Sequence, residues 1–273
     1  GDGASEELVG RALKEVPQGE RPLVATKCGR IMREDRTVFG RLKRESVIEE
    51  CEASLRRLGV DCIDLYQMHW PDPDEDIEEG WAAMAELVEA GKARQIGVSN
   101  QSVAQMKRLQ GRHSIASLQP PYSMLNRAIE DESLPFCEAE GIGVVCYSPM
   151  MKGLLTGGFT MERAAALSDN DHRSRDPKFT SPQVEINLEL VEEIRPLAEQ
   201  SGRPMAQLPI AWVLRRPEVT SAIVGVRRPS QIEQTAGAAD WQLSDGEVAA
   251  IESALRTRDA RLAELGEVSQ GWV

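Results

Sequence analysis

The stretch Asp61-Cys-Ile-Asp-Leu-Tyr-Gln-Met-His-Trp-Pro-Asp72 decides the fold of this chain. Its isoleucine, leucine and tyrosine favour a strand, and Pro71 ends that strand because proline has no amide proton for the ladder. Side chains alternate along a strand, so Leu65, Gln67 and His69 are expected on one face. The strand therefore brings His69 to its carboxyl end, where α/β proteins place their chemistry. A lone histidine there is more often structural, so a functional role needs further residues.

The composition sets the class of protein. A chain of 273 residues with 41% apolar residues suits one large α/β barrel or two small domains. A net charge of -12 argues against binding to nucleic acid or to anionic membranes. No apolar run reaches the roughly 20 residues of a membrane span, and residues 1–20 contain no secretory h-region. The five cysteines form no Cys-x-x-Cys or His/Cys pair, which predicts no metal site and buried thiols in a cytoplasmic protein.

Strands and helices alternate along the chain. The expected strands are 21–28, 61–70, 93–100, 114–122, 141–149 and 221–226. The expected helices are a first one capped by Ser5, then 45–58, 77–90, 102–109, 132–140, 184–200, 205–215, 230–239 and 244–256, followed by a polar tail. Residues 150–182 show little periodicity and are expected to form a long loop, which in a compact domain is functional or disordered.

This alternation predicts a parallel sheet with right-handed crossovers. Without repeats, linkers or a shift in composition, residues 1–273 are expected to form a single domain. A (β/α)8 barrel fits better than a doubly wound sheet, because no Gly-x-Gly-x-x-Gly follows any strand and Gly141-Ile-Gly143 precedes its strand instead. Gly91-Lys92 lacks the other residues of a phosphate loop, so that interpretation is dropped.

Six stretches, in order over nearly the whole chain, resemble the aldo-keto reductase family. They are Ala25-Thr-Lys27, Tyr66-Gln-Met-His-Trp-Pro-Asp72, Gly91-Lys-Ala-Arg-Gln-Ile-Gly-Val-Ser-Asn100, Leu118-Gln-Pro-Pro-Tyr-Ser123, Tyr147-Ser-Pro-Met-Met-Lys-Gly-Leu-Leu-Thr-Gly157 and Ala222-Ile-Val-Gly-Val-Arg227. The resemblance implies a barrel of the TIM type with NADP(H) extended across its carboxyl-end face. It also implies hydride transfer that reduces an aldehyde, ketone or sugar carbonyl to an alcohol.

The family's general acid is a tyrosine supported by a lysine, an aspartate and a histidine. Lys27 carries over as the lysine and His69 as the histidine. An ammonium beside a phenol lowers the pKa of the phenol, and an imidazole can hydrogen-bond the substrate oxygen. The alternatives are a surface lysine and a structural histidine.

The family's aspartate and tyrosine precede the segment that resembles residues 1–7, so they have no counterpart in this sequence. Only six of eight barrel strands are counted. Tyr66 faces away from His69 by alternation, Tyr122 lies beyond Pro121, and Tyr147 is given another role. We expect the tyrosine acid and the first two strands to lie upstream of this chain, which as given should be nearly inactive.

The resemblance also assigns residues to the nicotinamide half of the cofactor. Ser99, Asn100 and Gln119 would bind the carboxamide, although Ser99 and Asn100 would ordinarily form a turn or a helix cap. Tyr147 would stack on the nicotinamide ring, with a plain core aromatic as the alternative. The pyrophosphate would be lined by Ser148, Pro149, Gly153, Leu155 and Thr156, with a mobile loop as the alternative.

Arg227 and Arg228, after Gly225, stand out in an acidic chain. A guanidinium matches phosphate geometry, so Arg227 is interpreted as a clamp on the adenosine 2'-phosphate; the alternative is a solvated turn. Gln231 would reach the adenine, while Thr235 stands where the family often has asparagine. The sequence predicts a preference for NADPH over NADH.

Two other functions stay open at this point. The first is a non-catalytic NADPH-binding regulatory subunit on the same barrel, like the potassium-channel beta subunits. The second is an unrelated barrel lyase or isomerase. The loops that shape a substrate pocket vary between such barrels, so neither the carbonyl substrate nor the oligomeric state follows from the sequence.

Overall fold

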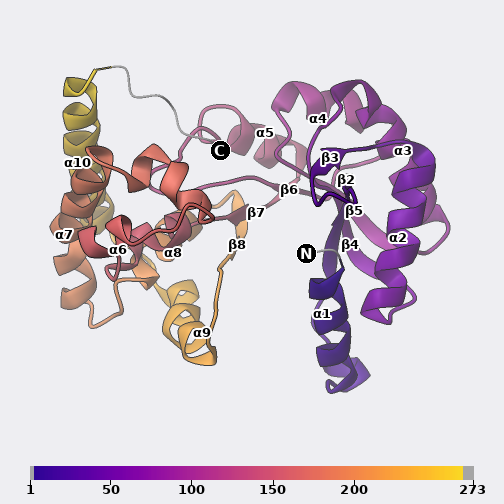
Figure 1. The fold of residues 1–273 in the computed structure, drawn as a ribbon, viewed down its shortest axis with the longest axis horizontal. Coiled ribbons are helices and arrows are strands. Elements are labelled where there is room, and N and C mark those ends of the chain that lie inside the picture. Colours follow the sequence, from indigo (N-terminus) through magenta and orange to yellow (C-terminus); the bar gives the residue numbers. More distant parts are fainter. Residues whose placement is uncertain (1–2, 267–273) are drawn as a thin grey trace. The chain divides into compact units, whose positions relative to one another are not determined.

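The computed structural model describes residues 3–266, and Figure 1 shows its elements. The strands are β1 (Ala25–Cys28), β2 (Arg30–Met32), β3 (Val38–Gly40), β4 (Ile63–Met68), β5 (Ala93–Ser99), β6 (Ser117–Gln119), β7 (Gly143–Tyr147) and β8 (Val219–Ile223). The α-helices are α1 (Ala4–Lys14), α2 (Arg44–Leu58), α3 (Ile77–Glu89), α4 (Val103–Gln110), α5 (Ser133–Glu140), α6 (Met161–Ala165), α7 (Gln183–Gln200), α8 (Gln207–Leu214), α9 (Pro229–Ala236) and α10 (Asp245–Glu264). No helix within residues 3–266 has both the length and the apolar character needed to cross a bilayer.

The chain divides into two compact units. The first unit is Gly1–Pro120 with Asp131–Val144, and the second is Pro121–Glu130 with Val145–Val273. Strand β7 begins in the first unit and ends in the second, where β8 follows it in the strand order. The single domain expected from the sequence stays a prediction.

A parallel sheet forms the centre of the first unit. Strands β1, β4, β5 and β6 pair in that order, and the start of β7 pairs with β6. Helices α2, α3 and α4 lie side by side along the sheet (Figure 1). Helix α2 buries Val47, Cys51, Leu55 and Leu58 at helical spacing and ends at Gly59, whose φ of 67° is left-handed. Tyr66 and its register partner Ile96 are fully buried, and Tyr66 donates to the Val47 carbonyl oxygen of α2, so these helices cover one face of the sheet.

A glycine sets the distance between two of these strands. A Cβ added at Gly97 would lie 2.3 Å from Ser117 Oγ and 2.8 Å from the Ser117 carbonyl oxygen. The backbone oxygen cannot yield without moving β6, so Gly97→Ala should lower the free energy of unfolding by about 1–3 kcal/mol. Urea unfolding measures the loss. Gly246→Ala in α10, where an added Cβ would lie 4.0 Å from Ser244 Oγ, is the control and should be neutral or slightly stabilising.

Long helices dominate the second unit. Helices α7 and α10 lie side by side (Figure 1), and Arg258 of α10 donates a 2.7 Å hydrogen bond to Asn187 of α7. Asn187 is fully buried and also donates to the Lys178 carbonyl oxygen at 2.9 Å. Helix α8 is apolar on nearly every side, because it packs against β8 and α9 as well as the unit's interior.

The structure corrects several expected element boundaries. An antiparallel pair, β2 with β3, was not expected from the sequence. Strand β8 begins at Val219 and ends at Ile223, earlier than predicted. Helix α10 continues past the predicted end at Arg256 to Glu264, because no glycine or proline lies between these two residues and Arg258 and Leu262 are buried. The first helix is preceded by Gly3 rather than capped by Ser5. The segment 150–182 contains α6 and short 3-10 turns at Met151–Thr156, His172–Arg175 and Pro177–Phe179.

Candidate active site

A polar row crosses the sheet of the first unit near the carboxyl ends of its strands. Lys27 of β1 pairs in register with Gln67 of β4, and Gln67 pairs with Gly97 of β5. Register partners point to the same face of a sheet. Since Gly97 has no side chain, Gln67 reaches past it and donates a 3.2 Å hydrogen bond to Ser117 Oγ. We call Lys27, Gln67, Gly97 and Ser117 the polar row.

One step closer to the strand ends lies a second group, the strand-end cluster of His69, Ser99, Asn100 and Gln119. The amide of His69 donates to the Cys28 carbonyl oxygen at 3.0 Å, which fixes His69 beside the end of β1. The Asn100 side chain donates to the His69 carbonyl oxygen at 3.0 Å and to Ser99 Oγ at 3.1 Å. Asn100 has a φ of 61°, a left-handed conformation that asparagine tolerates better than most residues. The cluster is therefore held together by its own hydrogen bonds.

Two members of this cluster are buried. Ser99 donates to the Gln119 carbonyl oxygen at 2.7 Å, and Gln119 Nε2 donates to Gln67 Oε1 at 2.9 Å. Only 1% of Ser99 and 7% of Gln119 is exposed. The structure thus brings together Lys27, His69, Ser99, Asn100 and Gln119, the residues that sequence reasoning placed at adjacent strand ends.

Burial and like charges set the protonation of this end of the sheet. Burial lowers the pKa of the Lys27 ammonium. The pKa of His69 falls from 6.5 to about 4, first because of burial and then because the Lys27 and Arg30 charges oppose a second cation. His69 is therefore neutral at pH 7 and can both donate and accept a hydrogen bond.

The shifted pKa of His69 makes a prediction about stability. In the unfolded chain His69 takes up a proton near pH 6.5, but in the folded protein only near pH 4. Between these values the unfolded state binds more protons, so the free energy of unfolding should fall as the pH is lowered through this window. Urea unfolding at several pH values measures the slope. His69→Gln should reduce the slope between pH 6.5 and pH 4. An equal slope in wild type and His69→Gln would contradict the assignment.

In the second unit, the chain after β7 winds into a tight turn. Ser148, Met151 and Lys152 have positive φ values of 58°, 44° and 52°, and Gly153 has 97°. Left-handed conformations in residues other than glycine cost free energy and gather at functional sites. Many of the turn's polar groups bond within it: the amides of Gly153 and Leu155 both donate to the Met150 carbonyl oxygen, and Thr156 Oγ1 donates to the Gly153 carbonyl oxygen at 2.8 Å.

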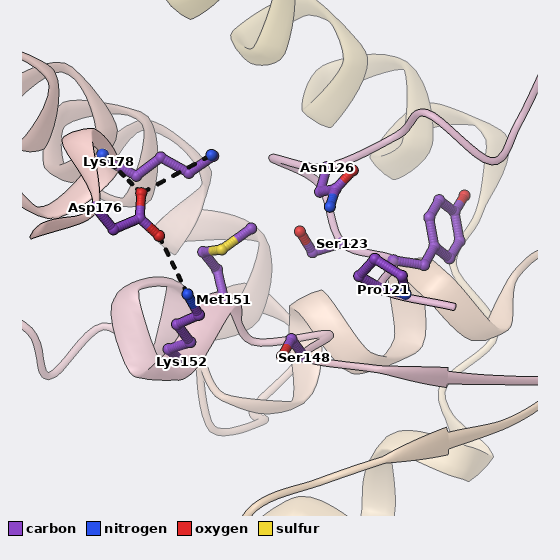
Figure 2. Close-up of a pocket in the computed structure, with 9 residues that line it drawn as sticks. Pro121, Ser123, Asn126, Ser148, Met151, Lys152, Asp176 and Lys178 are labelled. Atoms are coloured by element: carbon purple, nitrogen blue, oxygen red, sulfur yellow. Dashed lines mark hydrogen bonds and ion pairs between the residues drawn. The ribbon is translucent and has the colours of Figure 1, made fainter. Parts of the chain in front are cut away.

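A small pocket opens beside this turn (Figure 2). Its lining residues come from the turn, from the segment after β6 and from the 3-10 turns; they are Pro121, Tyr122, Ser123, Asn126, Ser148, Met151, Lys152, Asp176 and Lys178. Asp176 is 4% exposed and accepts from Lys152 Nζ at 3.2 Å, while Lys178 Nζ lies 3.9 Å from it. Two ammonium groups with one carboxylate leave a net positive charge. Of the lining residues, the sequence prediction named Ser148 alone.

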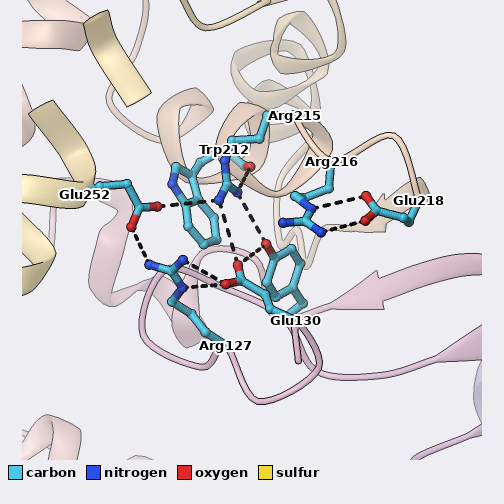
Figure 3. A network of polar contacts seen from close by, with 8 residues as sticks. Arg127, Glu130, Trp212, Arg215, Arg216, Glu218 and Glu252 are labelled. Carbon is cyan, nitrogen blue, oxygen red and sulfur yellow. Dashed lines mark hydrogen bonds and ion pairs between the residues drawn. The ribbon is translucent and has the colours of Figure 1, made fainter. Parts of the chain in front are cut away.

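Tyr122, which also lines the pocket, hydrogen-bonds to two members of an ion-pair network, Glu130 and Arg215. Figure 3 shows this network. The Tyr122 hydroxyl donates to Glu130 at 2.5 Å and accepts from Arg215 at 3.3 Å. Burial and the Glu130 carboxylate raise the pKa of Tyr122. Tyr66 of the first unit is fully buried, donates to the Val47 carbonyl oxygen, and has its pKa raised by burial. Neither tyrosine suits a general acid.

Tyr147 is the remaining tyrosine, and it ends β7. Its ring is partly exposed, and its carbonyl oxygen accepts from the Tyr122 amide at 3.1 Å. Burial raises the pKa of its hydroxyl. Pro149, two residues further, is buried. The expectation that the tyrosine acid precedes Gly1 stays a prediction.

The pair Arg227-Arg228 lies at the amino end of α9. Both side chains are exposed, and neither makes an ion pair with any residue in the described range 3–266. The Gln231 side-chain oxygen accepts from the amides of Arg227 and Arg228 at 2.7 and 3.1 Å. Gln231 thus fixes the turn from Gly225 into α9 and presents two guanidinium groups beside the positive end of a helix dipole. Within residues 3–266 no group of histidines, cysteines or acids could hold a metal ion.

Comparison with known proteins identifies the family. The sequence pattern of the "Aldo/keto reductase family" matches residues 1–256. The chain is 38% identical over 245 residues to "Aldo-keto reductase YhdN" of Bacillus subtilis, which covers 89% of this chain and 73% of that protein. It is 34% identical over 257 residues to the "NADH-specific methylglyoxal reductase" of Escherichia coli, covering 90% and 77%.

The fold agrees with this assignment. The solved structure of the glycerol dehydrogenase of Gluconobacter oxydans matches with a TM-score of 0.89 at 34% identity, over 99% of this chain and 81% of that one. The chain belongs to the aldo/keto reductase family. It is an oxidoreductase of that family, with an α/β fold and a parallel sheet of the aldo-keto reductase kind, and the predicted family is confirmed.

Proposed function

We propose that the protein reduces aldehyde or ketone carbonyls, including those of sugars, to alcohols with NADP(H). The observation that carries this proposal is the placement of Lys27 and His69 on neighbouring strand ends, beside the hydrogen-bonded amides of Asn100 and Gln119. An ammonium and a neutral imidazole at one strand end suit the polarisation of a carbonyl oxygen.

The residues present fit the cofactor at two places. Arg227 and Arg228, without carboxylate partners among residues 3–266, suit a phosphate group at the amino end of α9. The strand-end cluster offers amide and hydroxyl groups suited to a carboxamide. NADP(H), when bound, supplies the hydride. We assign Gly225, Arg227 and Gln231 to the adenosine end, and Ser148, Pro149, Gly153, Leu155 and Thr156 to the pyrophosphate.

The chain's own residues then have separate tasks. Ser99, Asn100 and Gln119 orient the carboxamide, and Tyr147 stacks on the nicotinamide ring. His69 donates a hydrogen bond to the substrate oxygen. Lys27 stabilises the phenolate form of the tyrosine acid, since a nearby ammonium favours the anion. Binding and orientation are the contributions of these residues, and the tyrosine contributes the proton.

The test is the oxidation of NADPH, with a panel of carbonyl compounds, by the purified full-length protein, so that any tyrosine upstream of Gly1 is included. Methylglyoxal, simple aldehydes, ketones and an aldose are the substrates, and glycerol with NADP⁺ tests the reverse direction. Loss of NADPH absorbance matched by alcohol formation supports the proposal. His69→Gln should abolish most of this activity, while His172→Gln should not. Tight NADPH binding with no turnover on any substrate would replace the proposal with a non-catalytic NADPH-binding subunit.

A further inference from the structure

The β2–β3 hairpin lies directly after the strand that carries Lys27. Cys28, the last residue of β1, accepts the amide of His69 at 3.0 Å, and β2 begins two residues later at Arg30. Arg30 pairs in register with Gly40, the last residue of β3. The base of the hairpin is therefore fixed next to the segment that follows β4, in which His69 and Asp72 lie.

Asp72 is held on this hairpin by two contacts. Its Oδ2 accepts from Arg30 Nη1 at 2.8 Å. A Cβ added at Gly40 would lie 2.1 Å from the Asp72 carbonyl oxygen and 2.5 Å from its carboxyl group. Because Gly40 has no positive φ, the need for glycine here is the close approach of Asp72 and not the backbone conformation. The hairpin thus binds the Asp72 carboxylate through Arg30 and leaves room for the Asp72 backbone at Gly40.

We propose that Arg30, Gly40 and Asp72 are positioning residues for His69. The hairpin holds Asp72 through the ion pair with Arg30 and the close approach at Gly40, and these contacts fix the imidazole beside Lys27. The segment from His69 to Asp72 is then held by contacts at both of its ends. Asn100 and the Cys28 carbonyl oxygen hold the backbone of His69, and Arg30 with Gly40 holds Asp72. This inference rests on the proposed catalytic role of His69.

The solvent exposure of the Arg30–Asp72 ion pair argues that the pair positions His69 and contributes little to the stability of the fold. The Arg30 side chain is 31% exposed and that of Asp72 56% exposed. Ion pairs as exposed as this contribute little to folding. The contact should therefore affect where His69 lies far more than whether the protein folds.

Electrostatics give the arrangement a second consequence. The charges that act on His69 are those of Lys27 on β1 and Arg30 on β2, and Arg30 is itself paired with the Asp72 carboxylate. Burial is the first cause of the low pKa of His69, and the charges of Lys27 and Arg30 act in the same direction. Arg30 thus helps to keep the imidazole neutral.

Proton NMR of the three histidine rings tests the inference without any turnover. His69→Gln identifies the His69 signal. Arg30→Met removes the charge and the ion pair, and should move the His69 titration upward from about 4 by roughly half a pH unit. In Arg30→Lys, which keeps the positive charge, the pH at which His69 titrates should shift less than in Arg30→Met. Arg41→Met, which removes a charge from an exposed residue just after β3, is the matched control and should titrate as wild type does.

Steady-state kinetics give the second readout. Asp72→Asn and Gly40→Ala should each lower kcat about 10-fold with an unchanged KM for NADPH, because a small displacement of a catalytic group is costly. Arg30→Met should behave likewise, and Arg30→Lys should recover most of the rate. Unchanged His69 titration in Arg30→Met, or a loss of kcat that Arg30→Lys does not restore, would overturn the inference. If the wild type reduces no carbonyl, the proposed function fails, while the NMR titration still decides the placement.

Discussion

Replacing Lys27 with methionine should lower kcat for carbonyl reduction by roughly 100- to 10,000-fold, the range that general acid catalysis contributes. Methionine keeps the length of the side chain and removes its charge. Without the ammonium, the proposed tyrosine acid loses the charge that lowers its pKa, and His69 loses one of the charges that oppose its protonation. The measurement is steady-state turnover with the best aldehyde of the panel.

The matched control for this prediction is Lys14→Met, since Lys14 is exposed on α1 and should show wild-type turnover. The dissociation constant for NADPH, measured by fluorescence, should change less than threefold in Lys27→Met, because the proposal gives Lys27 no cofactor contact. Turnover of Lys27→Met within fivefold of wild type would remove Lys27 from the catalytic role. A parallel loss of NADPH binding would move Lys27 to the cofactor site.

Replacing Arg227 with glutamine should weaken NADPH binding by about 10- to 150-fold, since a charge-assisted hydrogen bond contributes about 1.5–3 kcal/mol. The binding of NADH, which lacks the 2'-phosphate, should not change. A relative in Escherichia coli is named as NADH-specific, so membership of the family does not by itself fix which of the two cofactors is preferred. Isothermal titration with the two cofactors measures the effect.

Arg256→Gln is the control for the Arg227 variant, because Arg256 is exposed on α10 and lies far along the chain from α9. Equal losses of NADPH and NADH binding in Arg227→Gln would assign Arg227 to the pyrophosphate. Equal affinities of the wild type for the two cofactors would contradict the predicted preference for NADPH. Either result leaves the roles of Lys27 and His69 untouched.

Local sequence signals predicted most of the helices and strands of this chain. Gly59 ends α2 in the left-handed conformation, as a glycine after a helical stripe indicates. Ser102 caps α4 through a capping box with Gln105. Pro71 follows the end of β4 closely. These features depend on residues a few positions apart, which is the range over which sequence patterns carry structural information.

The β2–β3 hairpin was not predicted, because charged residues in and around its strands interrupt the alternation of apolar and polar residues. Its turn depends on Asp35, which accepts from the Thr37 amide at 2.8 Å, and on the left-handed φ of 67° at Arg36. Arginine is an unusual residue for that conformation. The strands on either side are three residues each, too short for alternation to stand out.

The candidate site was predictable in part. Alternation along one strand predicted Leu65, Gln67 and His69 on one face, and the register of the sheet pairs Lys27 with Gln67. The bond from Gln67 past Gly97 to Ser117 depends on the register of three strands, which no local pattern reveals. Lys152 and Asp176, which pair beside the pocket, lie 24 residues apart in a region without periodicity.

The central claim is that the strand ends bearing His69 bind a nicotinamide cofactor, and proton NMR of the histidine rings during a titration with NADP⁺ tests it most directly. The signal of His69 should shift saturably, while those of His113 and His172, which lie outside the proposed site, should stay in place. A titration that saturates by calorimetry without moving the His69 signal would contradict the account.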